Sequence, residues 1–217
     1  MICFEDVVVE LDQKGARQLY INAAFEAGDF VLIVGPNGSG KTSFLDLIAG
    51  VRPYQGGSIT GLIPDLPVAY AVQEPHGSLL PWRSILSNIL LPSHLSSQGE
   101  GLITEARELL NKFGLLDRAD DFPYTLSGGE KQAINFIRTI CTPAYIRLFD
   151  EVTASLHSSF KSVARDILPE NRESTTTFFI SHDSSDFILP FNRFFAIQRG
   201  SLKEISKDDA KEVISHV

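Results

Sequence analysis

Residues 30–42 read Phe-Val-Leu-Ile-Val-Gly-Pro-Asn-Gly-Ser-Gly-Lys-Thr, and this stretch decides the fold of the chain. Its first five residues form a continuous apolar run, which is typical of a short strand buried on both faces. The next eight residues match the pattern G-x-x-x-x-G-K-[ST] at every fixed position. After them, Phe44, Leu45 and Ile48 are spaced as on one face of a helix. A strand, a glycine-rich loop and a helix in that order predict a phosphate-binding loop.

The residue types of this loop suit the binding of a nucleoside triphosphate. Glycines allow backbone N–H groups to turn toward a phosphate without Cβ clashes, and the helix behind the loop adds further N–H groups and its positive end. Lys41 would reach the β- and γ-phosphates, and the hydroxyl of Thr42 would bind Mg²⁺. The candidate nucleotide-binding residues are Gly35, Pro36, Asn37, Gly38, Ser39, Gly40, Lys41, Thr42 and Ser43.

The segments on either side of the loop alternate between strand and helix patterns. Strands are predicted over residues 2–11, 19–25, 66–72, 145–149 and 176–180, and helices over 102–113, 130–141 and about 158–168. Alternation of this kind favours an α/β domain with a mainly parallel sheet. Residues 79–125 lack a central-strand pattern and predict a small helical insertion.

No linker divides the chain into independent parts, so we expect a single domain over residues 1–217. Residues 1–78 and 126–217 would form the nucleotide-binding core, and residues 79–125 a helical subdomain. The expected fold class is therefore α/β, with a P-loop NTPase core around a mainly parallel sheet, an antiparallel β subdomain and a small helical insertion.

Composition and charge argue against several classes of protein. The 19 basic and 27 acidic residues give a net charge of −8, which disfavours binding of a nucleic acid, because such affinity comes largely from neutralising phosphates. Cys3 and Cys141 lie far apart, so neither a disulfide framework nor a zinc site is expected. No apolar run approaches the ~20 residues of a membrane span, and the acidic N-terminal segment is unlike a signal peptide. We expect a soluble, cytoplasmic protein that reaches a membrane only through a partner.

Two acidic residues follow the predicted strand at 145–149. An acid at the end of an apolar strand is where P-loop NTPases hold Mg²⁺, and Asp150 would do so directly or through water. Glu151 could polarise the attacking water as a general base. Two acids after a strand are often only a surface turn, but beside a phosphate-binding loop they predict a catalytic pair.

Ser127, Gly128, Gly129 and Glu130 stand at the start of the predicted helix, with Ser127 23 residues before Asp150. A Ser-Gly-Gly step at a helix start is a second arrangement that binds anions. Taken alone, such a step is more often a helix cap or a linker. Its place in the order of motifs favours a functional role in binding an anion.

In this order the motifs resemble those of the ATP-binding cassette (ABC) family of ATPases, and the resemblance covers nearly the whole sequence. Residues 35–42 match the Walker A loop, Gln73 matches the Q-loop, and Leu-Ser-Gly-Gly-Glu at 126–130 matches the family signature. Asp150 and Glu151 match the Walker B pair, and the switch histidine is matched by His182, 31 residues beyond Glu151. The resemblance implies an ATPase that uses ATP and Mg²⁺.

The resemblance also implies a site completed by two cassettes paired head to tail, as a homodimer or a heterodimer. The signature residues Ser127, Gly128, Gly129 and Glu130 would contact the ATP bound to the partner. His182 would bind the γ-phosphate and position Glu151 and the water, and Gln73 would sense Mg²⁺. The implied catalytic residues are Glu151, His182, Lys41 and Gln73, and the implied metal ligands are Thr42, Gln73 and Asp150.

The segment after Gln73 resembles cassettes of the nitrate, sulfonate and taurine importer group, because Leu-Leu-Pro-Trp at 79–82 precedes a helix that contains an Asn. In ABC transporters this region lines the groove that receives a coupling helix of the membrane-spanning subunit. Leu79 and Trp82 would suit such a contact, since aromatic anchors are enriched at interfaces, although Trp82 could also pack the insertion. The resemblance implies a subunit on the inner face of the cell membrane that powers transport through nucleotide-driven dimer closure.

Two positions depart from the family pattern. Leu11 stands where many cassettes place an aromatic ring against adenine, and His157 replaces an Asp that helps communication across the dimer. Both departures motivate an alternative, a nucleotide-responsive subunit with weak hydrolysis. A second alternative is a soluble ABC ATPase resembling those of iron–sulphur assembly, with which the Leu-Ser-Gly-Gly-Glu-Lys signature is compatible.

Overall fold

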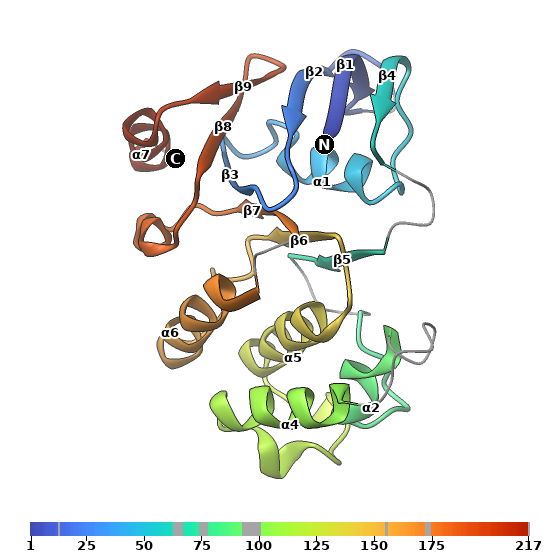
Figure 1. Ribbon diagram of the computed structural model, residues 1–217, viewed down its shortest axis with the longest axis vertical. Coiled ribbons are helices and arrows are strands. Elements are labelled where there is room, and N and C mark those ends of the chain that lie inside the picture. The colour runs from blue at the N-terminus through green and yellow to red at the C-terminus, as the bar shows by residue number, and fades with distance from the viewer. Residues whose placement is uncertain are drawn as a thin grey trace.

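The computed structural model describes residues 1–12, 14–62, 67–73, 78–92, 101–154, 156–171 and 175–216. The strands in these ranges are β1 (Ile2–Glu10), β2 (Gln18–Phe25), β3 (Phe30–Val34), β4 (Gly56–Thr60), β5 (Val68–Ala71), β6 (Ile146–Asp150), β7 (Thr176–Ile180), β8 (Arg193–Gln198) and β9 (Ser201–Ile205). Within the described residues they form one nine-stranded sheet in the order β4-β1-β2-β9-β8-β3-β7-β6-β5 (Figure 1).

The half of the sheet around β3 is parallel. Strand β3 pairs in parallel with β7 and β8, β7 pairs with β6, and β6 pairs with β5. Every residue of β3 and of β7 is buried, which is why both strands have continuous apolar or Thr-rich sequences rather than alternating ones. Since the strands run in the same direction, the ends of β3, β5, β6 and β7 lie at one edge of the sheet.

The other half of the sheet is antiparallel. Strand β1 pairs antiparallel with β2 and β4, and β8 pairs antiparallel with β9. A single parallel pair, Tyr20 with Ser201, joins β2 to β9 and makes the two halves continuous. The expected α/β fold with a mixed sheet is confirmed.

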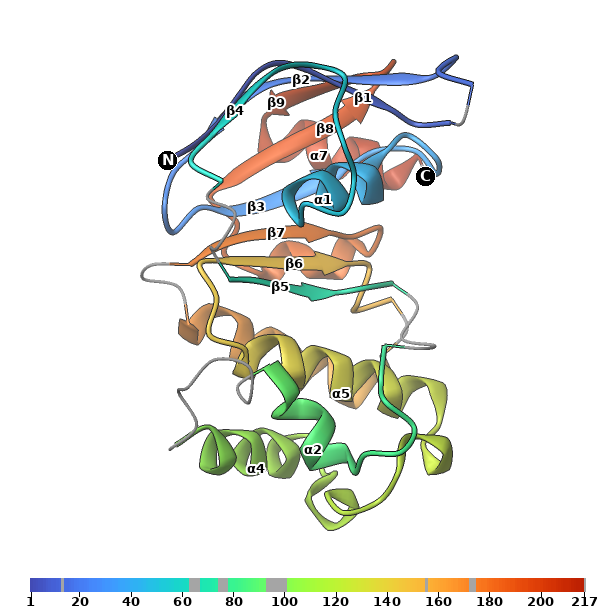
Figure 2. The same ribbon diagram turned by 90° about the vertical axis from the view of Figure 1, so that its right-hand side faces the viewer.

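The helices in the described ranges are α1 (Lys41–Ile48), α2 (Ile85–Ile89), α4 (Leu102–Lys112), α5 (Gly128–Cys141), α6 (Ser158–Ile167) and α7 (Lys207–Ser215). Single 3₁₀ turns are η1 (Leu116–Arg118), η2 (Pro123–Thr125), η3 (Leu168–Asn171) and η4 (Ser184–Ile188). Helix α1 lies on one side of the sheet, while α5 and α6 lie on the other (Figure 2). No helix in the described ranges has the length and apolar character needed to cross a lipid bilayer.

The core divides into two layers because side chains on a strand alternate between its faces. On β3, Val31 and Ile33 pack into the layer that contains α1, whereas Leu32 and Val34 pack into the layer that contains α5 and α6. Strand β3, which precedes the glycine-rich loop, is therefore packed on both faces. This fixes the position at which the loop leaves the sheet.

Helices α2 and α4 pack on α5 rather than on the sheet, and they occupy the lower end of the molecule in Figure 1. The backbone N–H of Ile85 donates to Asp121 O, and that of Leu86 donates to Ala119 O. These bonds connect the start of α2 to the end of the segment formed by residues 79–125. These contacts support our proposal that residues 79–125 form a helical subdomain on a core made of residues 1–78 and 126–217.

Candidate nucleotide-binding site

The glycine-rich loop connects β3 to α1 as the sequence predicts. Gly40 is the N-cap of α1 and adopts a φ of +110°, a left-handed conformation that favours glycine. At Gly35, an added Cβ would lie 2.6 Å from Ile197 O, so only glycine allows the loop to pass this close to β8. The loop therefore turns its backbone around a concave space at the N-terminus of α1.

Lys41 folds back over this loop. Its Nζ donates to Gly35 O at 2.8 Å and to Pro36 O at 3.1 Å. Burial lowers the pKa of Lys41, while the carboxylates of Glu151 and Asp150 oppose this change. The ammonium group is thus held inside the loop, next to the two acidic residues that the sequence assigned to the site.

Thr42 and Asp150 form the part of the site that would hold a metal ion. Thr42 Oγ1 donates to Asp150 Oδ2 at 2.7 Å. Asp150 Oδ1 is buried and has no hydrogen-bond partner within the described part of the chain. Burial raises the pKa of Asp150 to about 6, because the charged carboxylate has lost its water. A buried carboxylate with a free oxygen beside a hydroxyl fits the oxygen ligands that Mg²⁺ prefers.

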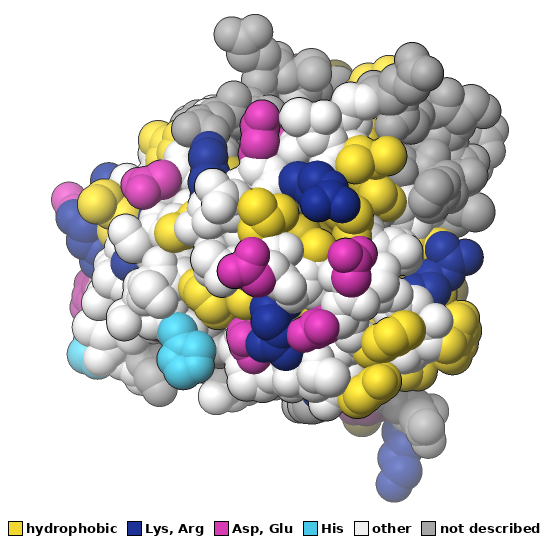
Figure 3. Space-filling view, turned by 90° about the horizontal axis from the view of Figure 1, so that it is seen from below, with side chains coloured by type: hydrophobic (Ala, Val, Ile, Leu, Met, Phe, Trp, Pro, Cys, Tyr) yellow, Lys and Arg dark blue, Asp and Glu magenta, His cyan; other side chains and the backbone are white. Residues whose placement is uncertain are grey.

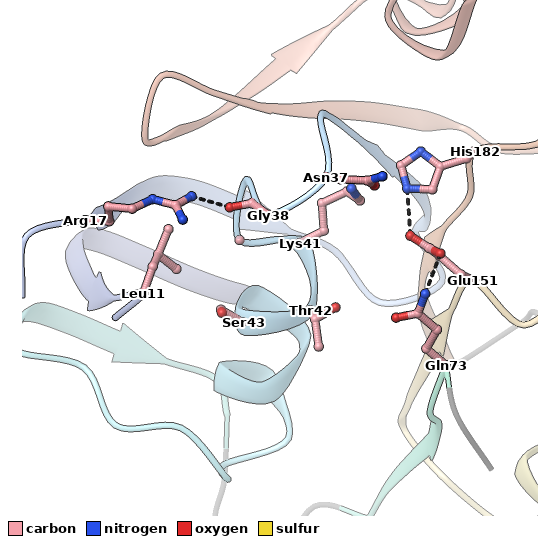
Figure 4. Close-up of a pocket in the computed structure, with 11 residues that line it drawn as sticks. Leu11, Arg17, Asn37, Gly38, Lys41, Thr42, Ser43, Gln73, Glu151 and His182 are labelled. Atoms are coloured by element: carbon pink, nitrogen blue, oxygen red, sulfur yellow. Dashed lines mark hydrogen bonds and ion pairs between the residues drawn. The ribbon is translucent and has the colours of Figure 1, made fainter. Parts of the chain in front are cut away.

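Glu151 lies between Gln73 and His182, two of the other three candidate catalytic residues. Gln73 Nε2 donates to its Oε2 at 2.7 Å, and His182 Nε2 lies 2.6 Å from its Oε1 (Figure 4). The backbone of Glu151 has a φ of +51°, which is a strained conformation for a residue with a side chain. Its N–H bonds to Ile180 O, which helps to hold the residue in that conformation.

The parallel strands explain why these residues meet although they are far apart in the sequence. Gln73 follows β5, Glu151 follows β6 and His182 follows β7, and β6 pairs with both of the other strands. Their carboxyl ends are therefore neighbours at one edge of the sheet. Catalytic side chains placed directly after adjacent parallel strands converge without any further constraint.

The loop and the catalytic side chains line one cavity of about 640 Å³. The lining residues are Leu11, Arg17, Asn37, Gly38, Gly40, Lys41, Thr42, Ser43, Gln73, Glu151 and His182. Figure 4 shows Leu11 and Arg17 at one end, Gln73, Glu151 and His182 at the other, and the loop between them. Leu11 is the residue that stands where many cassettes place an aromatic ring against adenine, whereas Arg17 was not assigned to the site because it lies in no recognised motif.

The signature residues lie outside this cavity. Ser127 is the N-cap of α5, where its Oγ accepts from Glu130 N at 3.3 Å, and Glu130 Oε2 accepts from Ser127 N at 2.7 Å. Arg118 Nη1 donates to Glu130 Oε1 at 3.0 Å, and the pKa of Glu130 is lowered chiefly by its hydrogen bonds with Ser127. Ser127 and Gly128 are exposed, and within the described residues an added Cβ at Gly128 would lie more than 4 Å from every atom outside its own stretch of helix.

A buried network of hydrogen bonds next to the candidate catalytic residues was not predicted from the sequence. Asp186, on η4, is fully buried, and its Oδ2 accepts from Thr153 Oγ1 and from Ser181 Oγ, each at 2.6 Å. Arg165 Nη2 donates to the other carboxylate oxygen at 2.7 Å. Thr153 lies two residues after Glu151, and Ser181 directly precedes His182. Asp186 therefore connects the two segments that carry the candidate catalytic residues Glu151 and His182.

The structure separates the two residues that the sequence assigned to the partner contact. Leu79 is only 5% exposed and belongs to the hydrophobic core, whereas Trp82 is 71% exposed. The proposed contact by Leu79 is therefore corrected, because its side chain is buried within the subunit. His157, at the other departure from the family pattern, is exposed and contacts the Phe160 ring edge-on, with the ring centroids 6.1 Å apart.

Comparisons with known proteins agree with this geometry. Residues 20–154 match the family model described as ABC transporter. The chain is 29% identical over 195 residues to the Aliphatic sulfonates import ATP-binding protein SsuB of Albidiferax ferrireducens, with 87% of this chain and 68% of that protein covered. It is 30% identical over 191 residues to Aliphatic sulfonates import ATP-binding protein SsuB 1 of Burkholderia cenocepacia, with 86% and 58% covered. The chain thus spans 58% to 68% of the length of these two relatives.

A solved structure extends the agreement to the fold. An ATP-binding cassette solved as a dimer in a post-hydrolysis state, bound to ADP and phosphate, is similar to this chain with a TM-score of 0.79 at 22% identity. The similarity covers 95% of this chain and 98% of that one. At this level of identity the likeness concerns the fold alone.

Proposed function

Because the chain belongs to the ABC transporter family, we propose that it is the ATP-binding and ATP-hydrolysing subunit that powers a membrane-spanning transporter. The observation that carries this proposal is the single cavity in which Glu151, held between Gln73 and His182, faces the loop of Lys41 and Thr42. The names of the relatives, which are import ATP-binding proteins, support an importer. No observation in the described residues favours the two alternative functions.

The loop residues would bind the triphosphate. Backbone N–H groups at the start of α1 and the positive end of this helix stabilise phosphate charge. Lys41 would leave the carbonyl groups of Gly35 and Pro36 and pair with the β- and γ-phosphates. Thr42, Asp150 and Gln73 would hold Mg²⁺, which neutralises charge on the β- and γ-phosphate oxygens.

Glu151 would act as the general base. A water placed between its carboxylate and the γ-phosphate attacks phosphorus, the bond from phosphorus to the bridging oxygen breaks, and ADP leaves with the electron pair. Glu151 takes the proton of the water. His182 holds the carboxylate of Glu151 and would also reach the γ-phosphate, so that the base, the water and phosphorus stay in line.

The exposed signature supports a site shared between two cassettes. Neither Ser127 nor Gly128 lines the cavity of its own subunit, and the described part of the chain gives no steric reason for a glycine at position 128. A second copy or a related cassette would bring its phosphate-bound end against this helix N-terminus, where the lack of a Cβ permits close approach. Closure of the two subunits would then complete each site and exclude water.

Alanine at Lys41 tests the proposed activity. We expect MgATP hydrolysis to fall by at least about 100-fold, and nucleotide affinity to fall with it, because a charge that stabilises the transferred phosphoryl group is lost. Phosphate release and calorimetric titration measure the two effects. Lys211→Ala, which removes an exposed lysine from α7, is the matched control and should leave both unchanged. Equal activity of the two variants would contradict an ATPase at this loop.

Trp82 tests the proposed contact with the membrane subunit. Figure 3 views the end of the molecule formed by the helical segment, where hydrophobic side chains form patches among acidic and basic ones. A photocrosslinking side chain in place of Trp82 should label a membrane-spanning chain in native membranes. The same side chain in place of Tyr145, which is 58% exposed, is the control and should not label that chain. Labelling of soluble chains alone from position 82 would contradict the contact. If position 82 labels a membrane-spanning chain as expected, the subunit sits on the inner face of the membrane through that partner.

A further inference from the structure

Both carboxylate oxygens of Glu130 have partners within the subunit. Its Oε2 accepts from Ser127 N at 2.7 Å, and its Oε1 accepts from Arg118 Nη1 at 3.0 Å. The first bond belongs to the cap of α5, whereas the second joins the helix to a residue that no motif assigns. In this arrangement the carboxylate serves the start of α5, and Arg118 serves the carboxylate.

The cap leaves the N-terminus of α5 open to an anion. Ser127 Oγ accepts from Glu130 N, and its own proton can still be donated. Within the described residues, no hydrogen bond occupies the N–H groups of Gly128 and Gly129. These donors are the groups that the proposed function places against the phosphates of a second cassette. A carboxylate without a compensating charge in the same turn of the helix would oppose that binding, because like charges repel.

We propose that Arg118 is a positioning residue for the signature: it compensates the charge of Glu130 and holds its carboxylate on Ser127 N, so that the start of α5 accepts the phosphates bound to a partner cassette. This inference rests on the proposed function, because it concerns the half of the shared site that lies outside the chain's own cavity. Arg118 belongs to η1 and does not line that cavity.

The guanidinium group of Arg118 joins the end of the helical segment to the first turn of α5. Besides the bond to Glu130, its Nε donates to Asp121 Oδ2, and its Nη2 donates to Thr125 O at 3.1 Å and to Thr125 Oγ1 at 3.0 Å. Thr125 ends η2, two residues before Ser127. Several bonds from one planar group fix the direction in which Nη1 meets the carboxylate, which the single ammonium group of a lysine would not do.

The charge of Glu130 has to be compensated by another side chain rather than by a proton. Hydrogen bonds with Ser127 are the main cause that lowers the pKa of Glu130, and Arg118 lowers it further, so the carboxylate is ionised at neutral pH. Asp121 shares the same guanidinium group, but its side chain is 43% exposed and water screens its charge. The side chain of Glu130 is 22% exposed, and its pairing with Arg118 is the more sheltered of the two.

The dimer that forms with MgATP in the Glu151→Gln background tests this role without turnover. We expect Arg118→Ala to weaken the dimer by at least about tenfold in sedimentation equilibrium, since each dimer contains two such contacts. Binding of a fluorescent ATP analogue to the monomer should not change, because Arg118 does not line the cavity. Arg107→Ala, which removes an exposed arginine from α4 in the same segment, is the matched control and should change neither quantity.

Glu130→Gln supplies the second arm of the test. The amide oxygen can still accept from Ser127 N, but no negative charge remains to be compensated. In the Glu130→Gln background we therefore expect the removal of Arg118 to weaken the dimer by less than about twofold. This double-mutant cycle separates the charge of Glu130 from the contacts of Arg118 with Thr125 and Asp121.

Three results would overturn the proposal. An unchanged dimer in Arg118→Ala would show that the charge of Glu130 needs no compensation. An equal loss in both backgrounds would show that Arg118 acts only on the fold of its segment, through Thr125 or Asp121. A fall in the affinity of the monomer for the nucleotide would show that Arg118 acts on the chain's own cavity. Failure of the Glu151→Gln chain with Arg118 intact to form any dimer with MgATP would instead contradict the proposed pairing of two copies.

Discussion

Glu151→Gln should lower the rate of ATP hydrolysis by at least about 100-fold and leave ATP binding intact. The amide has nearly the same size as the carboxylate but cannot accept the proton of the attacking water. The loop residues that would bind the phosphates are unchanged by the substitution. A loss of turnover without a loss of affinity separates the general base from the residues that only bind nucleotide.

The same variant should trap the closed dimer. If the two cassettes close around ATP and reopen after hydrolysis, a chain that binds ATP without hydrolysing it should accumulate in the closed state. Size-exclusion chromatography with MgATP should therefore show a dimer for Glu151→Gln and a smaller dimer fraction for the wild-type chain. Glu212→Gln, an exposed carboxylate on α7, is the control for the charge change.

Two outcomes would contradict these expectations. Hydrolysis by Glu151→Gln at the wild-type rate would exclude Glu151 as the base. A monomer at every protein concentration, with ATP bound, would exclude a homodimer, and mixing with a related cassette would then test a heterodimer. Hydrolysis and association are measured separately. The role of Glu151 as general base and the formation of a homodimer can therefore be contradicted independently.

The strands whose ends carry the candidate site residues could be predicted from the sequence, whereas much of the structure around them could not. The loop, Asp150, Glu151 and His182 follow or precede apolar strands with recognisable patterns, and parallel strands bring such ends together whatever the remaining sequence is. The orientation of Glu151 was not predictable, because its positive φ depends on the contact with Ile180 O across the sheet. Local patterns do not encode contacts of this kind.

The elements that the sequence did not indicate lack a local pattern. Strand β4 reads Gly-Gly-Ser-Ile-Thr, which has no strand pattern, and it forms by pairing with β1. The two strands approach so closely that an added Cβ at Gly57 would lie 2.3 Å from Glu5 O. Strands β8 and β9 and helix α7 follow His182, where no motif guided the interpretation. Asp186 illustrates the same limit, since its partners come from three separate segments. Leu79 was assigned to the partner contact together with Trp82 because both lie in the segment that resembles the groove-lining region of ABC transporters, and a local resemblance does not show which of its side chains is buried.

Asp150→Asn should abolish the dependence of nucleotide affinity on Mg²⁺ and, at the same time, stabilise the ligand-free chain. Asp150 is 1% exposed, and one of its carboxylate oxygens has no partner within the described residues. Without the metal ion, the buried negative charge of Asp150 is not fully compensated. This charge lowers the stability of the ligand-free chain. An amide carries no charge, and its oxygen can still accept from Thr42 Oγ1.

The pH dependence of stability gives the sign of this effect. Burial raises the pKa of Asp150 to about 6 in the folded chain, above its ordinary value of 3.8, so between these pH values the folded state binds more protons than the unfolded state. The free energy of unfolding of the ligand-free chain should therefore fall as pH rises through this range and stay low above pH 6. The difference at neutral pH is about 3 kcal/mol, and Asp150→Asn should recover most of it.

Thermal unfolding at pH 5 and pH 7.5, with and without MgATP, measures both consequences. Without ligand, Asp150→Asn should unfold at a higher temperature than the wild-type chain at pH 7.5, and the gap should narrow at pH 5, where Asp150 is largely protonated. With MgATP, only the wild-type chain should gain stability from the metal, because a ligand that binds the folded state stabilises it by an amount that rises with the logarithm of its affinity. Asp208→Asn, a carboxylate that is 90% exposed, controls for the change in net charge. A variant that unfolds at a lower temperature than the wild-type chain at pH 7.5 would show that the buried charge is compensated without a metal ion, and the metal site would have to be sought elsewhere.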